Sequence, residues 1–91
     1  MTMDELYKII ESRKHNTPSN SYVASLLAQG SDRVIQKVGE EAIELVIAAK
    51  NRGKDEIVGE AADLLFHTLI LLADQDVAMD DLKRELDRRR R

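Results

Sequence analysis

Two long helical patterns, separated only by the short stretch around Gly53, dominate the middle of the chain. When successive residues are placed at 100° intervals, as an α-helix requires, apolar side chains align along one face of each segment. The expected core stripes are Val34, Ile35, Val38, Ala42, Leu45, Val46 and Ala49, then Ile57, Val58, Ala61, Leu64, Leu65, Leu69 and Leu72, with Thr68 inside the second. Two such helices joined by a short turn predict a helical hairpin.

A second apolar strip, made of Phe66, Ile70 and Ala73, runs along the far side of the later helix. A helix that is apolar on most of its circumference must be covered on both sides. The partner helix provides one cover, and we expect a second subunit to provide the other, because a domain of 91 residues has only a modest core of its own. The sequence therefore predicts a single domain over residues 1–91, completed as a dimeric helical bundle.

Shorter helices are expected to flank the hairpin, and the fold class is all-α. Thr2 and Glu5 have the spacing of a capping box, which predicts a first helix over residues 3–14, before a loop at residues 15–20. A single proline and the lack of an alternating pattern argue against strands. Ser21 is expected to cap a second helix that runs through Leu27 and is closed by Gly30. The three later helices are expected to have their N-caps at Ser31 or Asp32, at Asp55 and at Asp80. In the last helix, Leu82 and Leu86 are expected to turn inward.

Composition excludes several classes of protein. The chain has no cysteine, which removes disulfides, cysteine-zinc sites and thiol nucleophiles. A net charge of −3 disfavours nucleic-acid binding, and the arginines at 88–91 are interpreted as complementing the negative end of a C-terminal helix. The longest apolar stretch, residues 64–73, is too short to span a bilayer, and no signal peptide opens the chain. We expect a cytoplasmic protein without a membrane partner.

Pairs of carboxylates at i, i+3 spacing flank both core stripes. Glu41 with Glu44, and Glu60 with Asp63, each project from one helix face, whereas Glu40 points further into solvent. An antiparallel hairpin would bring the two pairs together, and clustered carboxylates repel unless cations or protons neutralise them. Oxygen ligands suit Mg²⁺ or Mn²⁺, and Mg²⁺ also accepts phosphate oxygens. The pattern predicts a metal site for a phosphate-bearing ligand, although a single E-E-x-x-E run is more often a solvated face.

Other polar side chains carry weaker signals. His67 follows Asp63 by one helical turn and either orients that carboxylate, contacts the ligand or, more commonly for such a position, is a structural histidine. Lys37, Lys50 and Lys54 are candidate phosphate contacts, although each alone is typical of a surface lysine. The sequence contains no Walker loop, no G-x-S-x-G and no His/Cys metal cluster.

Residues 37–44 (KVGEEAIE) and 59–67 (GEAADLLFH) resemble the MazG-like all-α pyrophosphohydrolases, which share the pattern E-E-x-x-E, a spacer and E-x-x-D. The resemblance is closest to the phosphoribosyl-ATP pyrophosphatase family of histidine biosynthesis and covers about residues 6–86. That family typically has, in chain order, the pieces S-Y-T, L, G, R-I and K-x-G-E-E-A. This chain has Ser21-Tyr22-Val23, Leu26, Gly30, Arg33-Val34 and residues 37–42 at these places. Arg13-Lys14, before the loop, also fits the family pattern. Val23 replaces the usual threonine and so lacks its hydroxyl.

The resemblance implies a magnesium-dependent hydrolase that converts phosphoribosyl-ATP to phosphoribosyl-AMP and pyrophosphate, the second step of histidine biosynthesis. It further implies a nucleotide-binding homodimer or larger homo-oligomer, with the cyclohydrolase of the next step as a separate protein that receives the product. Expected metal ligands are Glu41, Glu44, Glu60 and Asp63, and the expected catalytic carboxylates are Glu40, Glu41 and Glu44, with Glu40 or Glu44 as the base. Expected substrate contacts are Arg13, Lys14, Ser21, Tyr22, Arg33, Lys37, Lys50 and His67.

Two other functions stay open. A house-cleaning nucleoside triphosphate pyrophosphohydrolase shares the acidic motif but not the segment at residues 21–37, and a comparison of substrates separates it. A non-catalytic helical dimerisation module accounts for the apolar strips but not for Glu60 and Asp63. A magnesium titration separates this alternative, because a scaffold alone neither binds the ion nor is stabilised by it.

Overall fold

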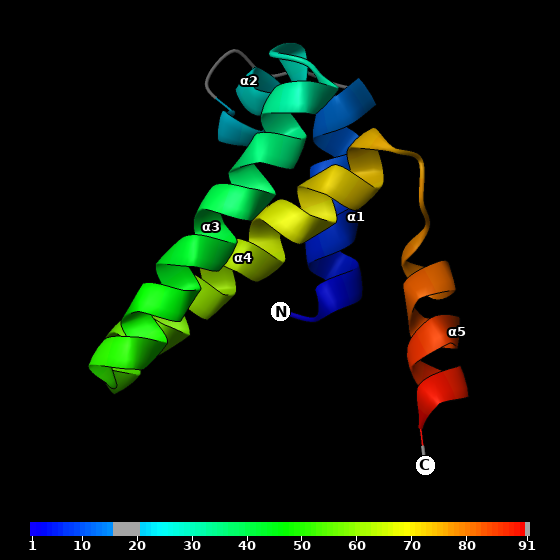
Figure 1. Ribbon diagram of the computed structural model, residues 1–91. Coiled ribbons are helices and arrows are strands. Elements are labelled where there is room, and N and C mark those ends of the chain that lie inside the picture. The colour runs from blue at the N-terminus through cyan, green and yellow to red at the C-terminus, as the bar shows by residue number, and fades with distance from the viewer. Residues whose placement is uncertain (16–20, 91) are drawn as a thin grey trace.

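The computed structural model describes residues 1–15 and 21–90, and this part of the chain forms five helices and no strand. They are α1 (Met3–His15), α2 (Tyr22–Ala28), α3 (Ser31–Asn51), α4 (Lys54–Asp74) and α5 (Met79–Arg89) (Figure 1). The all-α prediction is therefore confirmed, while residues 16–20 of the expected loop and Arg91 lie outside the described residues. No described helix combines the length and hydropathy that crossing a membrane requires.

Helices α3 and α4 form the predicted antiparallel hairpin and pack against each other, closest near the turn that joins them and further apart at the other end (Figure 1). The turn between them begins at Arg52, whose φ of 60° puts it in the left-handed region. Its backbone N–H donates to the carbonyls of Ala48 and Ala49, which closes the last turn of α3. Gly53 has a φ of −83° and serves as the N-cap of α4, so Arg52 rather than the glycine takes the left-handed position.

The two caps predicted from hydroxyl side chains are confirmed. The Glu5 backbone N–H donates to the Thr2 hydroxyl over 3.1 Å, and the Thr2 N–H donates to the Glu5 carboxylate over 3.3 Å, which completes a capping box. At the start of α2 the Ser21 hydroxyl accepts from the Ala24 N–H over 3.2 Å. These bonds satisfy backbone donors that a helix leaves without partners.

The other predicted N-caps are wrong. Gly30, Gly53 and Ala78 occupy the cap positions of α3, α4 and α5, and none of the three helices has a side-chain cap. The residues expected there lie inside the first turns instead, and they are Ser31, Asp32, Asp55 and Asp80. A carboxylate within the first turn still interacts favourably with the positive end of the helix dipole, so the acidic signal marked the helix start without marking the cap.

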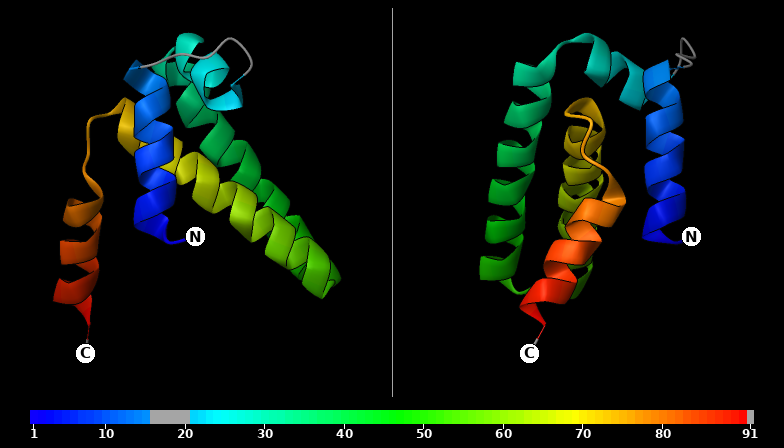
Figure 2. Two further views of the ribbon diagram at one scale, coloured as in Figure 1. Left: turned by 180° about the vertical axis from the view of Figure 1, so that it is seen from behind. Right: turned by 90° about the vertical axis from the view of Figure 1, so that its right-hand side faces the viewer.

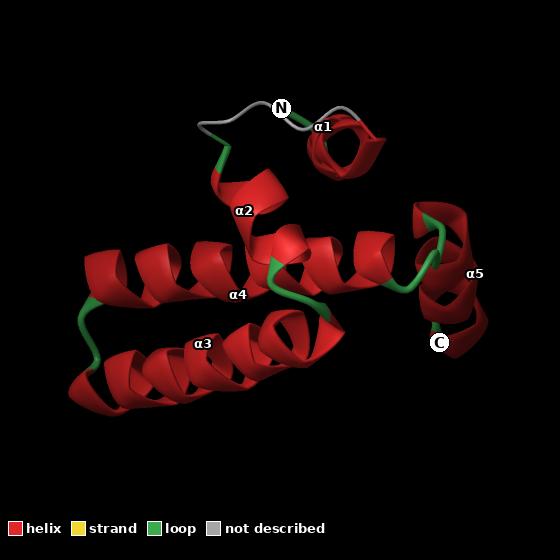
Figure 3. Ribbon diagram, turned by 90° about the horizontal axis from the view of Figure 1, so that it is seen from above, coloured by secondary structure: helices red, strands yellow, loops and turns green. Residues whose placement is uncertain are grey.

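The core lies between α4 and the short helices rather than between two subunits. Ile70 and Ala73, at 0% and 2% exposure, pack with Tyr7, Ile10, Val23 and Leu26 of α1 and α2, and Phe66 is half-buried against the same cluster. The expectation that a second subunit covers this strip is therefore wrong. The reason is physical: α1 and α2 lie on the side of α4 away from α3 (Figure 3), and their apolar residues cover the strip within the chain.

The opposite side of the hairpin is where apolar residues remain exposed. Val34 and Leu69 of the expected stripes are fully buried, and Val38, Ala42, Leu45, Ile57, Leu64, Thr68 and Leu72 are half-buried. The remaining members are exposed, contrary to expectation, and we call them the hairpin face: Ile35, Val46, Ala49, Val58, Ala61 and Leu65. The expected stripe of α4 is thus divided: Leu69 is buried in the core, whereas Val58, Ala61 and Leu65 are exposed.

Helix α5 stands apart from the hairpin, as the left-hand view of Figure 2 shows. Met79 is buried and Leu82 packs against the core, but Leu86 is 59% exposed, so the prediction that it turns inward is wrong. Arg88 and Arg89 occupy the last turn of α5 and donate hydrogen bonds to Glu85, which agrees with their interpretation as complements of the helix end.

Candidate active site

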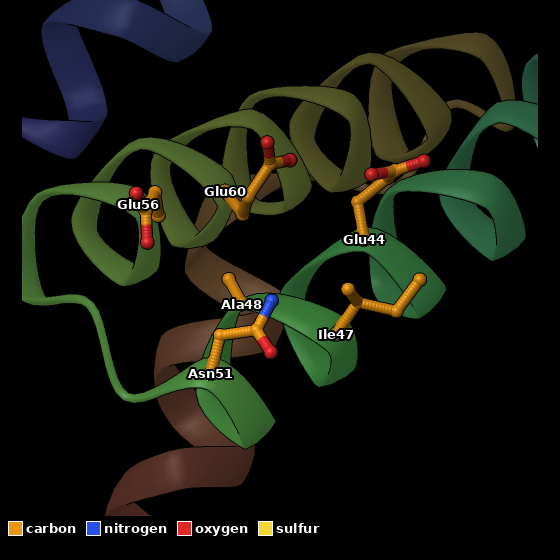
Figure 4. Close-up of a pocket in the computed structure, with 6 residues that line it drawn as sticks. All are labelled: Glu44, Ile47, Ala48, Asn51, Glu56 and Glu60. Atoms are coloured by element: carbon orange, nitrogen blue, oxygen red, sulfur yellow. The ribbon is translucent and has the colours of Figure 1, made fainter.

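The hairpin carries the four predicted ligands on its two facing helices. Glu41 and Glu44 belong to α3, and Glu60 and Asp63 belong to α4. Figure 4 shows Glu44 and Glu60 on either side of a small cavity between these helices. The cavity has a volume of about 160 Å³ and is lined by Glu44, Ile47, Ala48, Asn51, Glu56 and Glu60. Oxygen atoms therefore dominate the polar lining of this cleft.

The charge around Glu60 shows how close the pairs lie. Partial burial raises the pKa of Glu60, and the negative charges of Asp63, Glu44 and Glu41 raise it further. All four carboxylates thus place negative charge in one region of the hairpin. Among residues 1–15 and 21–90, however, no three acidic, histidine or cysteine side chains stand close enough together to hold a metal ion. The roles of these residues as metal ligands stay predictions.

Glu40 is tied to the flank of α3 rather than pointing freely into solvent, so the expectation of an outward side chain is wrong. Arg33 donates to its carboxylate over 3.3 Å and Gln36 over 2.9 Å, and the Lys37 ammonium lies 3.5 Å from it. Partial burial acts to raise the pKa of Glu40, but the charge and hydrogen bond of Arg33, together with Lys37 and Gln36, outweigh it and hold the pKa below its usual range. Two of the predicted substrate contacts, Arg33 and Lys37, are therefore held beside Glu40.

His67 is a buried link between α4 and α2. Its side chain is 5% exposed, with Nδ1 lying 2.8 Å from the Asp63 backbone carbonyl and Nε2 lying 2.8 Å from the Tyr22 hydroxyl. A carbonyl only accepts, so Nδ1 carries the hydrogen. In the neutral ring Nε2 then accepts from the Tyr22 hydroxyl. This geometry is that of a structural histidine, and it places Tyr22 next to the turn of α4 that presents Asp63.

Arg13 and Lys14 lie at the end of α1, away from the hairpin cavity. The Lys14 ammonium donates to the Ala73 carbonyl over 2.9 Å and pairs with Asp76, which ties α1 to the end of α4. Both basic residues line a separate cavity of about 250 Å³ that also includes Asp74. The structure therefore does not bring Arg13 and Lys14 together with the carboxylate pairs.

The remaining predicted contacts are scattered. Ser21 caps α2, and the exposed residues Lys50 and Lys54 flank the turn of the hairpin. Two polar residues of the cavity lining were not predicted, Asn51 and Glu56. Glu56 lies four residues before Glu60, hence on the same face of α4. Acidic residues are common in the first turn of a helix for electrostatic reasons alone, so the sequence did not single out Glu56 as a site residue.

An all-α hairpin with carboxylate pairs on facing helices is the architecture that the resemblance to MazG-like pyrophosphohydrolases implies. The family model described as phosphoribosyl-ATP pyrophosphohydrolase matches residues 3–90. The protein named phosphoribosyl-ATP pyrophosphatase from Methanocella arvoryzae is 48% identical, over 98% of this chain and 96% of its own length. Proteins of the same name from Trichlorobacter lovleyi and Pelobacter propionicus are 52% and 53% identical, over 96% of this chain and 81% of theirs.

The chain belongs to the phosphoribosyl-ATP pyrophosphohydrolase family. This membership confirms the resemblance drawn from the acidic motif and from the segment at residues 21–37. The family model and the similar proteins cover nearly the whole chain, so the hairpin and its flanking helices are all part of the match.

Proposed function

We propose that this protein hydrolyses phosphoribosyl-ATP to phosphoribosyl-AMP and pyrophosphate, the second step of histidine biosynthesis. The observation that carries the proposal is the family match over residues 3–90, combined with carboxylate pairs that act on one region of the hairpin. A house-cleaning nucleotide hydrolase is less well supported, because the similar proteins bear the name of the biosynthetic enzyme. A simple dimerisation module leaves the like charges around Glu60 unexplained.

The chemistry of the donor set fits Mg²⁺. The candidate ligands Glu41, Glu44, Glu60 and Asp63 offer only carboxylate oxygens, which hard divalent cations prefer. The raised pKa of Glu60 reflects negative charge that a cation would neutralise. When bound, Mg²⁺ supplies neutralisation of phosphate charge and a lowered pKa for a coordinated water. Mn²⁺ has the same preference for oxygen and is expected to substitute.

The protein's own side chains are then candidates for proton transfer and for phosphate binding. Glu44 is the better candidate to accept a proton from the attacking water, because its carboxylate is exposed on the cavity. Glu40 is a weaker base, since Arg33 and Lys37 hold its pKa low. Those two cations are positioned beside the carboxylates and can contact phosphate oxygens by charge-assisted hydrogen bonds. Glu40 thereby orients the groups that receive the phosphate.

The hairpin face supports a homodimer. Val46, Val58 and Leu65 are 60%, 59% and 44% exposed, and contiguous exposed apolar residues mark surfaces of association. On helix α4, Leu65 lies about 200° around the axis from Asp63, nearly opposite it. A symmetric dimer formed through this face buries the apolar residues of both copies and leaves the carboxylates open to substrate.

The proposed reaction also indicates where in the cell the protein acts and which molecules it meets. Its substrate and product are phosphorylated metabolites, and the chain has no cysteine, so we place it in the cytoplasm. Its product, phosphoribosyl-AMP, is the substrate of the cyclohydrolase reaction that forms the next step. No nucleic acid or membrane takes part in this scheme.

Growth of a histidine auxotroph tests the proposal. A strain lacking this step should grow without histidine when it expresses the chain, because the missing hydrolysis is restored. The matched control is Glu60→Gln, which keeps the side-chain volume but removes one charged ligand, and it should not restore growth. Equal protein levels are checked by immunoblot. If the natural sequence is well expressed and growth still requires histidine, the pathway assignment fails and a house-cleaning hydrolase is favoured.

A further inference from the structure

We infer that the exposed ring of Tyr22 is a stacking platform for the purine base of the substrate, and that His67 is the residue that positions it. The inference rests on the proposed function, because it assumes that the nucleotide phosphates lie at the carboxylate pairs. It assigns an adenine subsite to α2 and α4 that the hydrolysis alone does not require.

The first observation is where the few aromatic residues lie. The chain has two tyrosines, one phenylalanine and no tryptophan, and Tyr22 and Phe66 form one cluster with His67. The rings of Tyr22 and Phe66 are stacked at 6.4 Å and 27°, and His67 meets both rings edge-on. Tyr22 is nevertheless 51% exposed, whereas Tyr7 is buried in the core. An aromatic ring supported from behind and open in front suits the flat face of a base.

The second observation is the way the Tyr22 ring is held. Its hydroxyl donates to His67 Nε2 over 2.8 Å, and the opposite nitrogen of His67 is bound to the backbone of α4. The imidazole is 5% exposed and so has little freedom to rotate. A ring fixed before binding loses less conformational freedom when a ligand stacks on it. His67 is therefore a positioning residue rather than a direct contact of the substrate.

The third observation is the distance to the candidate phosphate site. His67 follows Asp63 by four residues on the same face of α4, a rise of about 6 Å along the helix axis. The Tyr22 hydroxyl sits at the His67 end of this interval. One helical turn is the scale of the sugar that separates a base from its phosphates. A nucleotide whose phosphates meet the carboxylates thus places its base at the Tyr22 ring.

Tyrosine fluorescence tests the platform directly. The chain has no tryptophan, so a Tyr7→Phe variant reports Tyr22 alone and a Tyr22→Leu variant reports Tyr7 alone. Adenosine 5′-monophosphate should quench the emission of Tyr7→Phe, because the base covers the Tyr22 ring. Ribose 5-phosphate, which lacks a base, should not. No saturable quenching of Tyr7→Phe by the adenine nucleotide overturns the inference, and this arm does not require that Tyr22→Leu folds.

Kinetics with phosphoribosyl-ATP provide the second readout. Tyr22→Leu should raise KM about tenfold, equivalent to about 1.4 kcal/mol, with kcat changed by less than about twofold. His67→Gln retains a polar partner for the hydroxyl and should raise KM less than His67→Leu does. Tyr7→Phe is the matched control and should leave KM unchanged. An unchanged KM in Tyr22→Leu overturns the platform while turnover upholds the proposed function. Quenching by the adenine nucleotide without any turnover of phosphoribosyl-ATP upholds the platform and refutes the function.

Discussion

Glu60→Gln and Asp63→Asn are expected to lower turnover by about two orders of magnitude or more while leaving the metal-free protein equally or slightly more stable. Each substitution keeps the side-chain volume, so no cavity forms. Each also removes one negative charge from the group of carboxylates around Glu60, where the charges repel one another. Stabilisation by Mg²⁺ should shrink in both variants, because a charged ligand is lost. Glu44→Gln and Glu41→Gln are expected to behave in the same way.

The sign of the stability change depends on pH. Because the folded-state pKa of Glu60 is raised, the fold binds this proton more tightly than the unfolded chain does. The stability of the natural metal-free protein therefore falls as pH rises from about 4, the ordinary range of a glutamate, through the raised value. Any gain in melting temperature from Glu60→Gln should be present at pH 7 and vanish near pH 4.

Glu40→Gln is the matched control for the four carboxylate variants. Partial burial acts to raise the pKa of Glu40, but Arg33 and Lys37 outweigh it and the pKa is lowered. The charge of Glu40 therefore stabilises the fold above this pKa, and the contribution is lost as pH falls through it. Its substitution should lower the metal-free melting temperature or leave it unchanged, and should affect metal binding less. The measurement is the melting temperature with and without Mg²⁺, beside turnover. Inner variants that melt much lower without metal yet keep their activity would show that these carboxylates are structural.

Leu65→Glu is expected to convert a dimer to a monomer. The residue is 44% exposed in the single chain and lies in the hairpin face, where a dimer would bury its charge without a partner. Light scattering should give twice the chain mass for the natural protein and one chain mass for the variant. Helix content by circular dichroism should persist, since the core between α4 and the short helices does not include Leu65.

Ile70→Ala is the matched comparison, because Ile70 lies on the other side of the same helix and is fully buried. It should lower the free energy of unfolding by about 2–5 kcal/mol through lost burial and a residual cavity, without acting on the contact between subunits. The opposite pattern, with Ile70→Ala monomeric and Leu65→Glu dimeric, would return the interface to the strip that the sequence suggested. A natural protein that is monomeric at micromolar concentration would refute the dimer.

Much of the fold follows from the sequence, since helical periodicity and hydroxyl caps are local signals. The hairpin, the capping box at Thr2 and the cap at Ser21 were predictable in this way. The identity of the core was not, because a helical wheel shows which faces are apolar but not which element covers them. Ile70 and Leu65 lie on opposite sides of α4, and only the packing of α1 and α2 decides which one is buried.

The candidate site shows the same division between local and long-range information. The acidic pairs are visible at i, i+3 spacing, and the hairpin that brings them together follows from the apolar stripes. The direction of Glu40 does not, because its long side chain bends back to Arg33, two turns earlier on the helix. For His67 the sequence left three interpretations, namely orienting Asp63, contacting the ligand or a structural role. The hydrogen bond to Tyr22, 45 residues away in the chain, favours the structural role.

The proposed function is tested most directly by product analysis of phosphoribosyl-ATP hydrolysis by the purified protein with Mg²⁺, beside a panel of deoxynucleoside triphosphates. We expect phosphoribosyl-AMP and pyrophosphate as the only products, with kcat/KM for phosphoribosyl-ATP at least about 100-fold above that for any triphosphate in the panel. Release of inorganic phosphate in place of pyrophosphate, or faster turnover of the deoxynucleoside triphosphates, would contradict it.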